Sequence, residues 1–159
     1  MLVGVSHLVE PVGVVHSDRT DPRDTDHWGS VVSTIRIDDR FPVDCLLGLE
    51  DFSHVEVLFV FDRAEEHEEY HARPARGRAD LPAVGVFAGR GPRRPNRVGA
   101  TICQVLSAEG RTLTVRGLDA VDGTPVIDIK PVLTQFLPTD VRQPAWVDAL
   151  MAEYFVDRP

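Results

Sequence analysis

Cysteine is scarce in this chain, and its scarcity excludes two common ways of stabilising a small domain. The 159 residues include two cysteines, Cys45 and Cys103, which provide neither a disulfide framework nor a multi-cysteine zinc site. No apolar run approaches the roughly 20 residues that span a bilayer, and no basic residue precedes the apolar residues of 1–11 as in a secretion signal. Hydrophobic residues make up 43% of the chain and charged residues 26%, which is a globular composition. We therefore expect one domain over 1–159, located in the cytoplasm and without membrane contact.

Lysine is nearly absent, and the arginines that replace it are unevenly distributed. Lys130 is the one lysine among 17 basic residues, and the net charge is -8. The segment 73–97 contains seven arginines and a single acid, Asp80, so its charge is +6, whereas the rest of the chain has a charge of -14. The seven are Arg73, Arg76, Arg78, Arg90, Arg93, Arg94 and Arg97. This polarity suits an anionic ligand bound at one place, although a solvated arginine-rich loop is the alternative interpretation.

Apolar and polar residues alternate with a period of two over most of the chain, which predicts strands rather than helices. The predicted strands are 12–15, 33–37, 54–61, 83–88, 101–106, 112–115 and 126–129. The strand at 54–61 is apolar on one face from Val55 to Phe61 and also carries Leu58 and Val60 on the other, so it is expected to be central. Turn signals at Glu109-Gly110 and Asp122-Gly123 predict hairpin connections.

Helices are few in this prediction. A short polar helix is expected at 64–71, and a longer one at about 144–156, where Pro144 suits a first turn. Trp146, Leu150 and Tyr154 recur four residues apart in the second, so it must dock on the sheet or on a second subunit. We predict a mainly β fold, a compact barrel with a docked C-terminal helix.

Two familiar site patterns are absent or unconvincing. His67 and His71 fit the zinc pattern H-E-x-x-H, but the surrounding residues are polar on every face and Pro74 follows closely, so a solvated acidic helix is favoured and no metal is expected. The segment 89–94 begins like a dinucleotide-binding loop but has no third glycine, and no phosphate-binding loop spacing occurs.

The chemistry-bearing residues are concentrated in two stretches. In 85–99, Pro92 and Pro95 stiffen a loop that displays planar, permanently charged donors suited to carboxylate or phosphate. These side chains are Arg90, Arg93, Arg94, Asn96 and Arg97. In 117–131 there are three aspartates and the lone lysine: Asp119, Asp122, Asp128 and Lys130. Asp128 and Lys130 share a strand face, either as a structural ion pair or with the carboxylates receiving ribose hydroxyls or a cation.

Five segments occur in an order that resembles the TsaA/TrmO-like family of S-adenosylmethionine-dependent methyltransferases. They are 11–17 (PVGVVHS), 48–54 (GLEDFSH), 85–90 (GVFAGR), 94–99 (RPNRVG) and 118–131 (LDAVDGTPVIDIKP), so the resemblance spans about 11–131. It implies a β-barrel rather than a Rossmann methyltransferase, a homodimer with the cofactor cleft near the subunit contact, and N6-methylation of N6-threonylcarbamoyladenosine beside the tRNA anticodon.

The resemblance also implies a cofactor site for S-adenosyl-L-methionine. Arg90 would bind the methionyl carboxylate, Asp119 the ribose hydroxyls, and the backbone of Gly117 and Leu118 the adenine edge. Phe61, Asp62 and Arg63 match a family position that lines the cofactor.

On the acceptor side, Asn96 and Arg94 would orient the acceptor base, with Arg93 and Arg97 beside them. Asp122 or Asp128 would take the N6 proton, and Lys130 completes the catalytic set. The base must be splayed from its loop to be reached.

Three departures from the family pattern keep other acceptors open. Pro22-Arg23-Asp24 replaces Pro-Arg-Gln in the first loop, and Val132 replaces a tyrosine that would stack on a base. The C-terminal extension of longer tRNA-modifying members is not expected after Pro159. A methyltransferase for a small metabolite, and a cofactor-binding module without catalysis, therefore remain alternatives to a tRNA methyltransferase.

Overall fold

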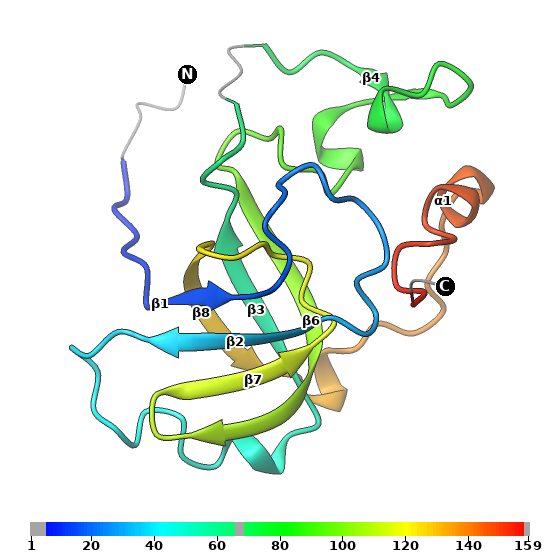
Figure 1. Ribbon diagram of the computed structural model, residues 1–159. Coiled ribbons are helices and arrows are strands. Elements are labelled where there is room, and N and C mark those ends of the chain that lie inside the picture. Colours follow the sequence, from blue (N-terminus) through cyan, green and yellow to red (C-terminus); the bar gives the residue numbers. More distant parts are fainter. Residues whose placement is uncertain (1–5, 66–68, 158–159) are drawn as a thin grey trace.

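The computed structural model describes residues 6–65 and 69–157 and contains a closed, antiparallel, six-stranded β-barrel (Figure 1). The strands follow one another around the barrel in the order β1-β2-β7-β6-β3-β8. Their bounds are β1 Gly13–His16, β2 Val32–Ile37, β3 His54–Val60, β6 Val98–Glu109, β7 Thr112–Arg116 and β8 Pro125–Pro131. The mainly β barrel predicted from the sequence is confirmed.

The remaining elements are short. A two-stranded ribbon joins β4 (Arg73–Pro74) to β5 (Ala83–Val84), and the helix α1 covers Ala145–Leu150. The 3-10 turns are η1 Leu49–Asp51, η2 Ala75–Gly77, η3 Val86–Ala88 and η4 Thr134–Phe136. No helix in the described part of the chain is long and apolar enough to cross a membrane.

Strand β3 has a partner strand on each side, as every strand of a closed barrel does. It pairs with β6 on one side, where Val57 lies opposite Thr101, and with β8 on the other, where Val57 lies opposite Ile129. Its inward residues Val55, Val57 and Phe59 are at most 1% exposed. The period-two alternation therefore corresponds to the inside and the outside of the barrel.

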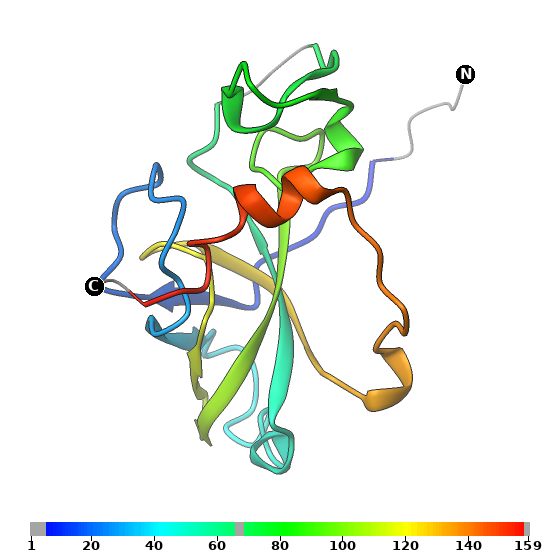
Figure 2. The same cartoon turned by 90° about the vertical axis from the view of Figure 1, so that its right-hand side faces the viewer.

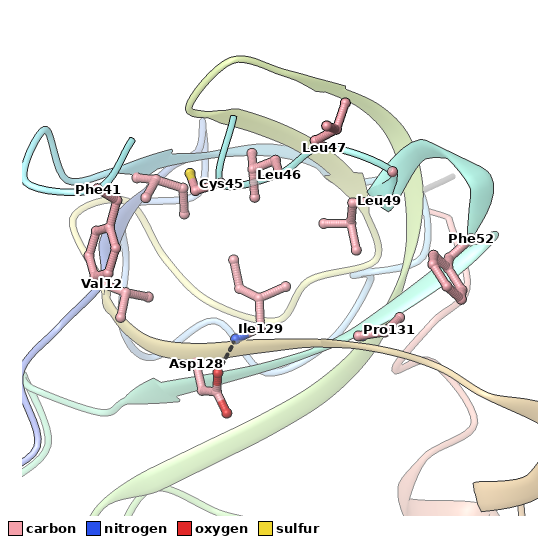
Figure 3. Close-up of a pocket in the computed structure, with 12 residues that line it drawn as sticks. Val12, Phe41, Cys45, Leu46, Leu47, Leu49, Phe52, Asp128, Ile129 and Pro131 are labelled. Atoms are coloured by element: carbon pink, nitrogen blue, oxygen red, sulfur yellow. Dashed lines mark hydrogen bonds between the residues drawn. The ribbon is translucent and has the colours of Figure 1, made fainter. Parts of the chain in front are cut away.

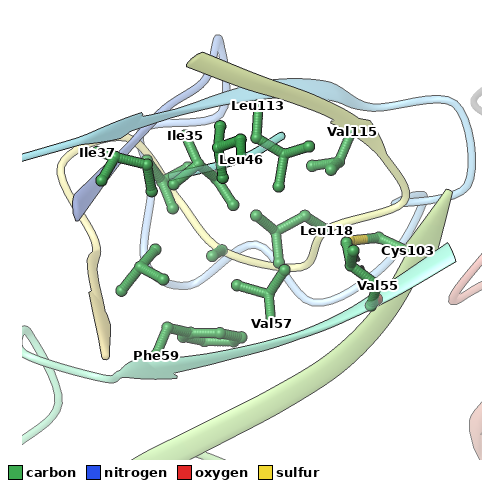
Figure 4. Packing of buried hydrophobic residues seen from close by; sticks show 13 residues of the cluster. Ile35, Ile37, Leu46, Val55, Val57, Phe59, Cys103, Leu113, Val115 and Leu118 are labelled. Carbon is green, nitrogen blue, oxygen red and sulfur yellow. Dashed lines mark hydrogen bonds between the residues drawn. The ribbon is translucent and has the colours of Figure 1, made fainter. Parts of the chain in front are cut away.

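The barrel interior is filled by side chains and forms the core (Figure 4). Close packing requires glycine at position 99 in β6, because a Cβ there would lie 2.4 Å from the Phe59 ring. The interior is thus a packed core rather than a ligand channel. Any binding site must lie at an end or on the outside.

The two ends of the barrel differ. At one end, which we call the capped end, the segment 38–53 folds over the barrel and buries Leu46. A pocket of about 500 Å³ lies there, lined mainly by apolar side chains; Ile129 points into it and Asp128 points away (Figure 3). The other end, which we call the loop end, carries the connections 17–31, 61–64, 85–97 and 117–124.

Three local expectations need correction. The C-terminal helix ends at Leu150, not at about 156, because the carbonyls of Glu153 and Tyr154 accept hydrogen bonds from the backbone of His27 and Trp28 instead of continuing the helix. The expected strand 83–88 is two strand residues followed by the 3-10 turn η3. The strand expected at 54–61 is buried on its inward face only, since its outward residues Leu58 and Val60 are half-exposed.

The helix expected at 64–71 includes residues outside the described part of the chain. His67 is one of them, so the H-E-x-x-H pattern cannot be placed as a unit. Among the described residues, no group of three or more histidine, cysteine or acidic side chains is arranged to hold a metal ion.

Candidate functional site at the loop end of the barrel

The carboxylate of Asp119 is fixed by two hydroxyl groups at the loop end. Thr101 Oγ1, from β6, donates to Oδ1, and Tyr154 Oη, from the C-terminal segment, donates to Oδ2. Thr101 is 6% exposed, whereas Asp119 itself is half-buried. The acidic side chain is therefore held in one orientation by groups from two distant parts of the chain, while remaining partly accessible.

Burial keeps the Tyr154 phenol and the neighbouring Cys103 thiol protonated. Desolvation raises the pKa of the Tyr154 phenol well above its ordinary value, and the charge of Asp119 raises it further. Burial, and secondarily the same carboxylate, raise the pKa of the adjacent Cys103 thiol to about 12. The phenol and the thiol nearest to the Asp119 carboxylate thus stay neutral at ordinary pH.

Two arginines lie close enough to this cluster to act on it electrostatically. The charges of Arg76 and Arg90 both lower the pKa of Tyr154, against the larger upward effect of burial. Arg90 donates from Nη2 to the carbonyl of Ala100, next to Thr101 in β6. The structure therefore brings together Arg90 and Asp119, two residues expected to hold the cofactor.

Arg76 has a larger structural role than its place in the sequence indicates. Its guanidinium lies 5.5 Å from the centre of the Tyr154 ring, and its Nη1 is 3.0 Å from Asp26 Oδ1. It links the arginine-rich segment to the loop 17–31 and to the C-terminal segment.

Asp122 and Arg63 occupy the same end of the barrel. The backbone N–H of Ser17 donates to Asp122 Oδ1 at 3.1 Å, and Arg63 Nη2 donates to the Asp122 carbonyl at 2.8 Å. His16 Nδ1 lies 3.8 Å from the same carboxylate, whose side chain is 44% exposed. Asp122 is thus oriented by backbone and still open to solvent.

The other expected cofactor residues are differently placed. Phe61 packs edge-on against Phe59, with ring centres 5.2 Å apart, and Asp62 is exposed beside it. The Gly117 N–H already donates to the Val31 carbonyl, and Leu118 is fully buried in the core. The Gly117 N–H is therefore engaged within the protein, and an adenine edge would have to use other backbone groups of Gly117 and Leu118.

The loop 85–97, which we call the arginine loop, is held by hydrogen bonds from its arginine side chains to backbone carbonyls. Arg94 Nη1 donates to the carbonyl of Gly89 at 3.1 Å, and Arg97 Nη1 donates to the carbonyl of Ala64 at 3.2 Å. Arg93 lies 3.7 Å from Glu65, and Asn96 is exposed. Because a guanidinium has five N–H donors, Arg93 and Arg94 keep donors for an anion.

Asp128 and Lys130 are not brought to this cluster. They form an ion pair with each other on the outer face of β8, the structural alternative considered above. Lys130 lies opposite Glu56, five residues along β8 from Pro125, and Asp128 lies opposite Leu58. At roughly 3.3 Å per residue, this distance along the strand separates Lys130 from the loop end.

Sequence reasoning missed three members of the site: Thr101, Arg76 and the hydroxyl of Tyr154. Tyr154 was assigned to an apolar helix face, yet a buried tyrosine hydroxyl needs a partner, which was the available signal.

Asp24, where the family pattern has glutamine, pairs with Arg19 at 2.6 Å, and that arginine stacks on Trp28 at 4.2 Å. This departure thus contributes to the structure of the loop 17–31.

Comparison with protein families gives a match over most of the chain. Residues 14–136 match the family described as tRNA-methyltransferase O N-terminal domain. The chain belongs to this family. The family resemblance inferred from the five sequence segments is thereby confirmed, and the match covers all six barrel strands except Gly13, together with the arginine-rich segment 73–97.

Relatives of the tRNA-methyltransferase O family differ in length and in their names. A human protein named tRNA (adenine(37)-N6)-methyltransferase is 37% identical over 145 residues, covering 86% of this chain and 33% of the relative. A Pyrococcus abyssi protein, named probable S-adenosyl-L-methionine-binding protein, is 32% identical over 156 residues, covering 90% of this chain and 76% of the relative. The crystal structure of TrmO from Pseudomonas aeruginosa superposes with a TM-score of 0.71 at 28% identity, covering 98% of this chain and 65% of that one. The chain therefore spans about a third of the human relative and just under two thirds of the solved structure.

Proposed function

We propose that this chain is an S-adenosyl-L-methionine-dependent methyltransferase that modifies N6 of adenosine 37, in its threonylcarbamoyl form, beside the anticodon of a tRNA. The observation that carries the proposal is the family match over 14–136, which includes Arg90, Asp119 and Asp122 of the loop-end site. Relatives at 35–37% identity from human, mouse and rat are named tRNA (adenine(37)-N6)-methyltransferase.

The residues at the loop end fit this cofactor in their chemistry. The Asp119 carboxylate is oriented and half-buried, as a group that accepts ribose hydroxyls should be. Arg90 lies near it with unused donors for the methionyl carboxylate. When bound, S-adenosyl-L-methionine supplies a methyl group activated by its sulfonium.

The same end carries groups suited to the acceptor. Asn96 and Arg94 orient the adenine base from the rigid arginine loop, with Arg93 and Arg97 contacting the neighbouring phosphates. Asp122, fixed by the Ser17 N–H and open to solvent, takes the proton that N6 loses. Because methyl transfer is an in-line displacement, positioning contributes most of the rate enhancement. Asp128 and Lys130 have no part in this scheme.

We further propose that the protein acts as a homodimer in the cytoplasm, where its tRNA substrate is found. Phe136 is 82% exposed and Val141 69% exposed on the segment that follows β8, and both apolar side chains would be withdrawn from water at a subunit interface. Light scattering at micromolar concentration tests the dimer, and a Phe136→Asp variant should be monomeric if this surface contributes. A monomeric wild-type protein would contradict the dimer.

The activity is tested with radiolabelled S-adenosyl-L-methionine, supplied with bulk tRNA or with a metabolite extract. We expect label in tRNA, lost when the threonylcarbamoyl modification is absent from the tRNA. Label found only in the metabolite fraction would instead identify a small-molecule methyltransferase. An Asp122→Asn variant should transfer at least tenfold more slowly, while Asp128→Asn, as its matched control, should be close to wild type.

One observation favours a second candidate, a cofactor-binding protein without transfer. The Pyrococcus abyssi relative, of which this chain covers 76%, is named for binding rather than for catalysis. Calorimetric binding of S-adenosyl-L-methionine with no label in either fraction would support that candidate.

A further inference from the structure

The C-terminal segment 145–157 contributes a side chain to the candidate cofactor site. In Figure 2, α1 crosses the barrel near the loop end, and the chain after it runs beside the loop 17–31. The backbone N–H groups of His27 and Trp28 donate to the carbonyls of Glu153 and Tyr154 at 2.9 Å and 2.8 Å. These two bonds place the Tyr154 ring over the barrel end that holds Asp119.

Tyr154 is held through its ring as well as its backbone. Arg76 covers the ring at 5.5 Å and is itself fixed by Asp26, with Nη1 to Oδ1 at 3.0 Å. The Met151 sulfur lies 4.0 Å from Arg76 Nη2. The phenol thus approaches Asp119 from a fixed direction, set by the loop 17–31 and the arginine-rich segment.

The hydrogen bonds to Asp119 leave room for a ligand. A carboxylate offers about four acceptor positions, two on each oxygen. Thr101 Oγ1 occupies one position on Oδ1 and Tyr154 Oη one on Oδ2. One position remains on each oxygen, which matches the two neighbouring hydroxyls of a ribose.

Without the phenol, only Thr101 would restrain this carboxylate. The terminal torsion of an aspartate has a broad and shallow energy profile, so a single hydrogen bond fixes it poorly. Two donors on opposite oxygens define the plane of the carboxylate, and hence the direction in which it can accept two further hydrogen bonds.

We propose that Tyr154 is a positioning residue that orients the Asp119 carboxylate toward the ribose diol of the cofactor. The inference rests on the proposed function, because it takes the ribose of S-adenosyl-L-methionine as the ligand of Asp119. It extends the site beyond the matched residues 14–136, to a segment of the chain that follows the barrel.

The test compares S-adenosylhomocysteine with its 2′-deoxyribose and 3′-deoxyribose analogues by calorimetry. Wild-type protein should bind the parent ligand at least about tenfold more tightly than either analogue. Tyr154→Phe, which removes only the hydroxyl, should weaken parent binding about fivefold to twentyfold and change analogue binding less than twofold. Tyr70→Phe is the matched control, since Tyr70 is the other tyrosine of the chain and lies 38% exposed.

The outcomes separate a positioning role from a structural one. Equal weakening of all three ligands by Tyr154→Phe, or no weakening at all, overturns the proposal, and thermal melting of each variant shows whether it folds. If wild-type protein binds S-adenosylhomocysteine without distinguishing the analogues, the positioning role fails while the proposed methyltransferase survives. If wild-type protein binds neither S-adenosylhomocysteine nor S-adenosyl-L-methionine, both proposals fail.

Discussion

Arg90 uses one of its five N–H donors on the Ala100 carbonyl, which fixes its direction and leaves four donors for a ligand. We predict that Arg90→Ala weakens S-adenosyl-L-methionine binding about tenfold to a hundredfold, because a charge-assisted contact is worth about 1.5–3 kcal/mol. The measurement is calorimetry, with Arg78→Ala as the control. Arg78 belongs to the same segment but pairs with Asp80, two residues away and exposed. Equal dissociation constants for the two variants would place the anion elsewhere.

Arg76 is unsuitable as that control, although it lies only two residues from Arg78. Its contacts with Tyr154 and Asp26 tie it to the site, so its removal would disturb Asp119 indirectly. The sequence gives no sign of this difference, because both arginines lie in one polar stretch and only the long-range contacts distinguish them.

The buried thiol of Cys103 makes the free energy of unfolding depend on pH in the alkaline range. Its pKa is raised from 9.0 to about 12 in the folded protein, so between these values the unfolded chain releases the thiol proton and the folded chain keeps it. This contribution to the free energy of unfolding is fully present below pH 9 and is lost as pH rises toward about 12, by up to about 1.4 kcal/mol per pH unit.

We predict that Cys103→Ala makes the decline of the free energy of unfolding above pH 9 shallower. Urea denaturation at several alkaline pH values measures the slope, and the exposed Cys45 offers the matched variant Cys45→Ala, which should keep it. Slopes are compared rather than absolute values, since shortening a buried side chain lowers stability at every pH. The same slope in both variants would show that the thiol does not ionise on unfolding in this range.

At the scale of elements, the segment after α1 depends on a close approach at Gly29. A Cβ at this position would lie 1.9 Å from the Phe155 carbonyl oxygen and 2.8 Å from its carbon, both backbone atoms that cannot easily move. We predict that Gly29→Ala displaces the C-terminal segment, lowers the melting temperature and accelerates amide exchange at His27 and Trp28. Hydrogen-exchange mass spectrometry measures the last effect.

Gly91→Ala is the control for this change. A Cβ at Gly91 meets no atom within 4 Å, so this variant should exchange as wild type does. Unchanged exchange at His27 and Trp28 in Gly29→Ala would mean that the segment 153–155 is not held by this backbone pairing.

Elements built from local patterns were predictable, and those built from distant contacts were not. The alternation of apolar and polar residues over 54–61 predicted the strand β3, and the turn at Gly110 predicted the hairpin β6–β7. The end of α1 depends on loop residues more than a hundred positions away, which no helical periodicity contains. For the site, Asp119 and Arg90 stood out through their sequence motifs, whereas Tyr154 joins them only through the folded path of the C-terminal segment.

Asp128 and Lys130 are the converse case at the scale of elements. They share the segment 118–131 with Asp119, so sequence proximity associated them with the same site. An extended strand separates residues quickly, and β8 carries Lys130 away from the loop end toward the capped end. Residues that are close in the sequence can therefore lie far apart when an extended strand separates them.

For the whole molecule, the uneven charge predicts how binding responds to salt. A segment of charge +6 on a body of charge -14 should bind tRNA mainly through phosphates, with an affinity that falls steeply as salt rises. Cofactor binding should change much less, since it depends on few charges at a partly buried site. Fluorescence anisotropy with labelled tRNA, at several salt concentrations, measures the first slope and calorimetry the second.

Removal of one phosphate contact should change the salt dependence of tRNA binding. Arg93→Ala should weaken tRNA binding and lower the salt slope by about one, whereas Arg142→Ala, outside the arginine-rich segment, should leave it unchanged. Transfer to the true acceptor at a rate independent of salt would favour a small neutral metabolite.

The closed barrel also restricts how two copies can meet. Each of its six strands has a neighbour on both sides, but the pairing does not run along every strand: the stretch 98–103 of β6 and the stretch 128–131 of β8 pair with β3 alone. Sheet continuation from one subunit into the next, and fibril growth templated on a bare edge, are therefore limited to these short stretches and to the two-residue strands β4 and β5 while the barrel is intact. A dimer that forms through side chains alone should leave the amide exchange of the six barrel strands unchanged when it dissociates.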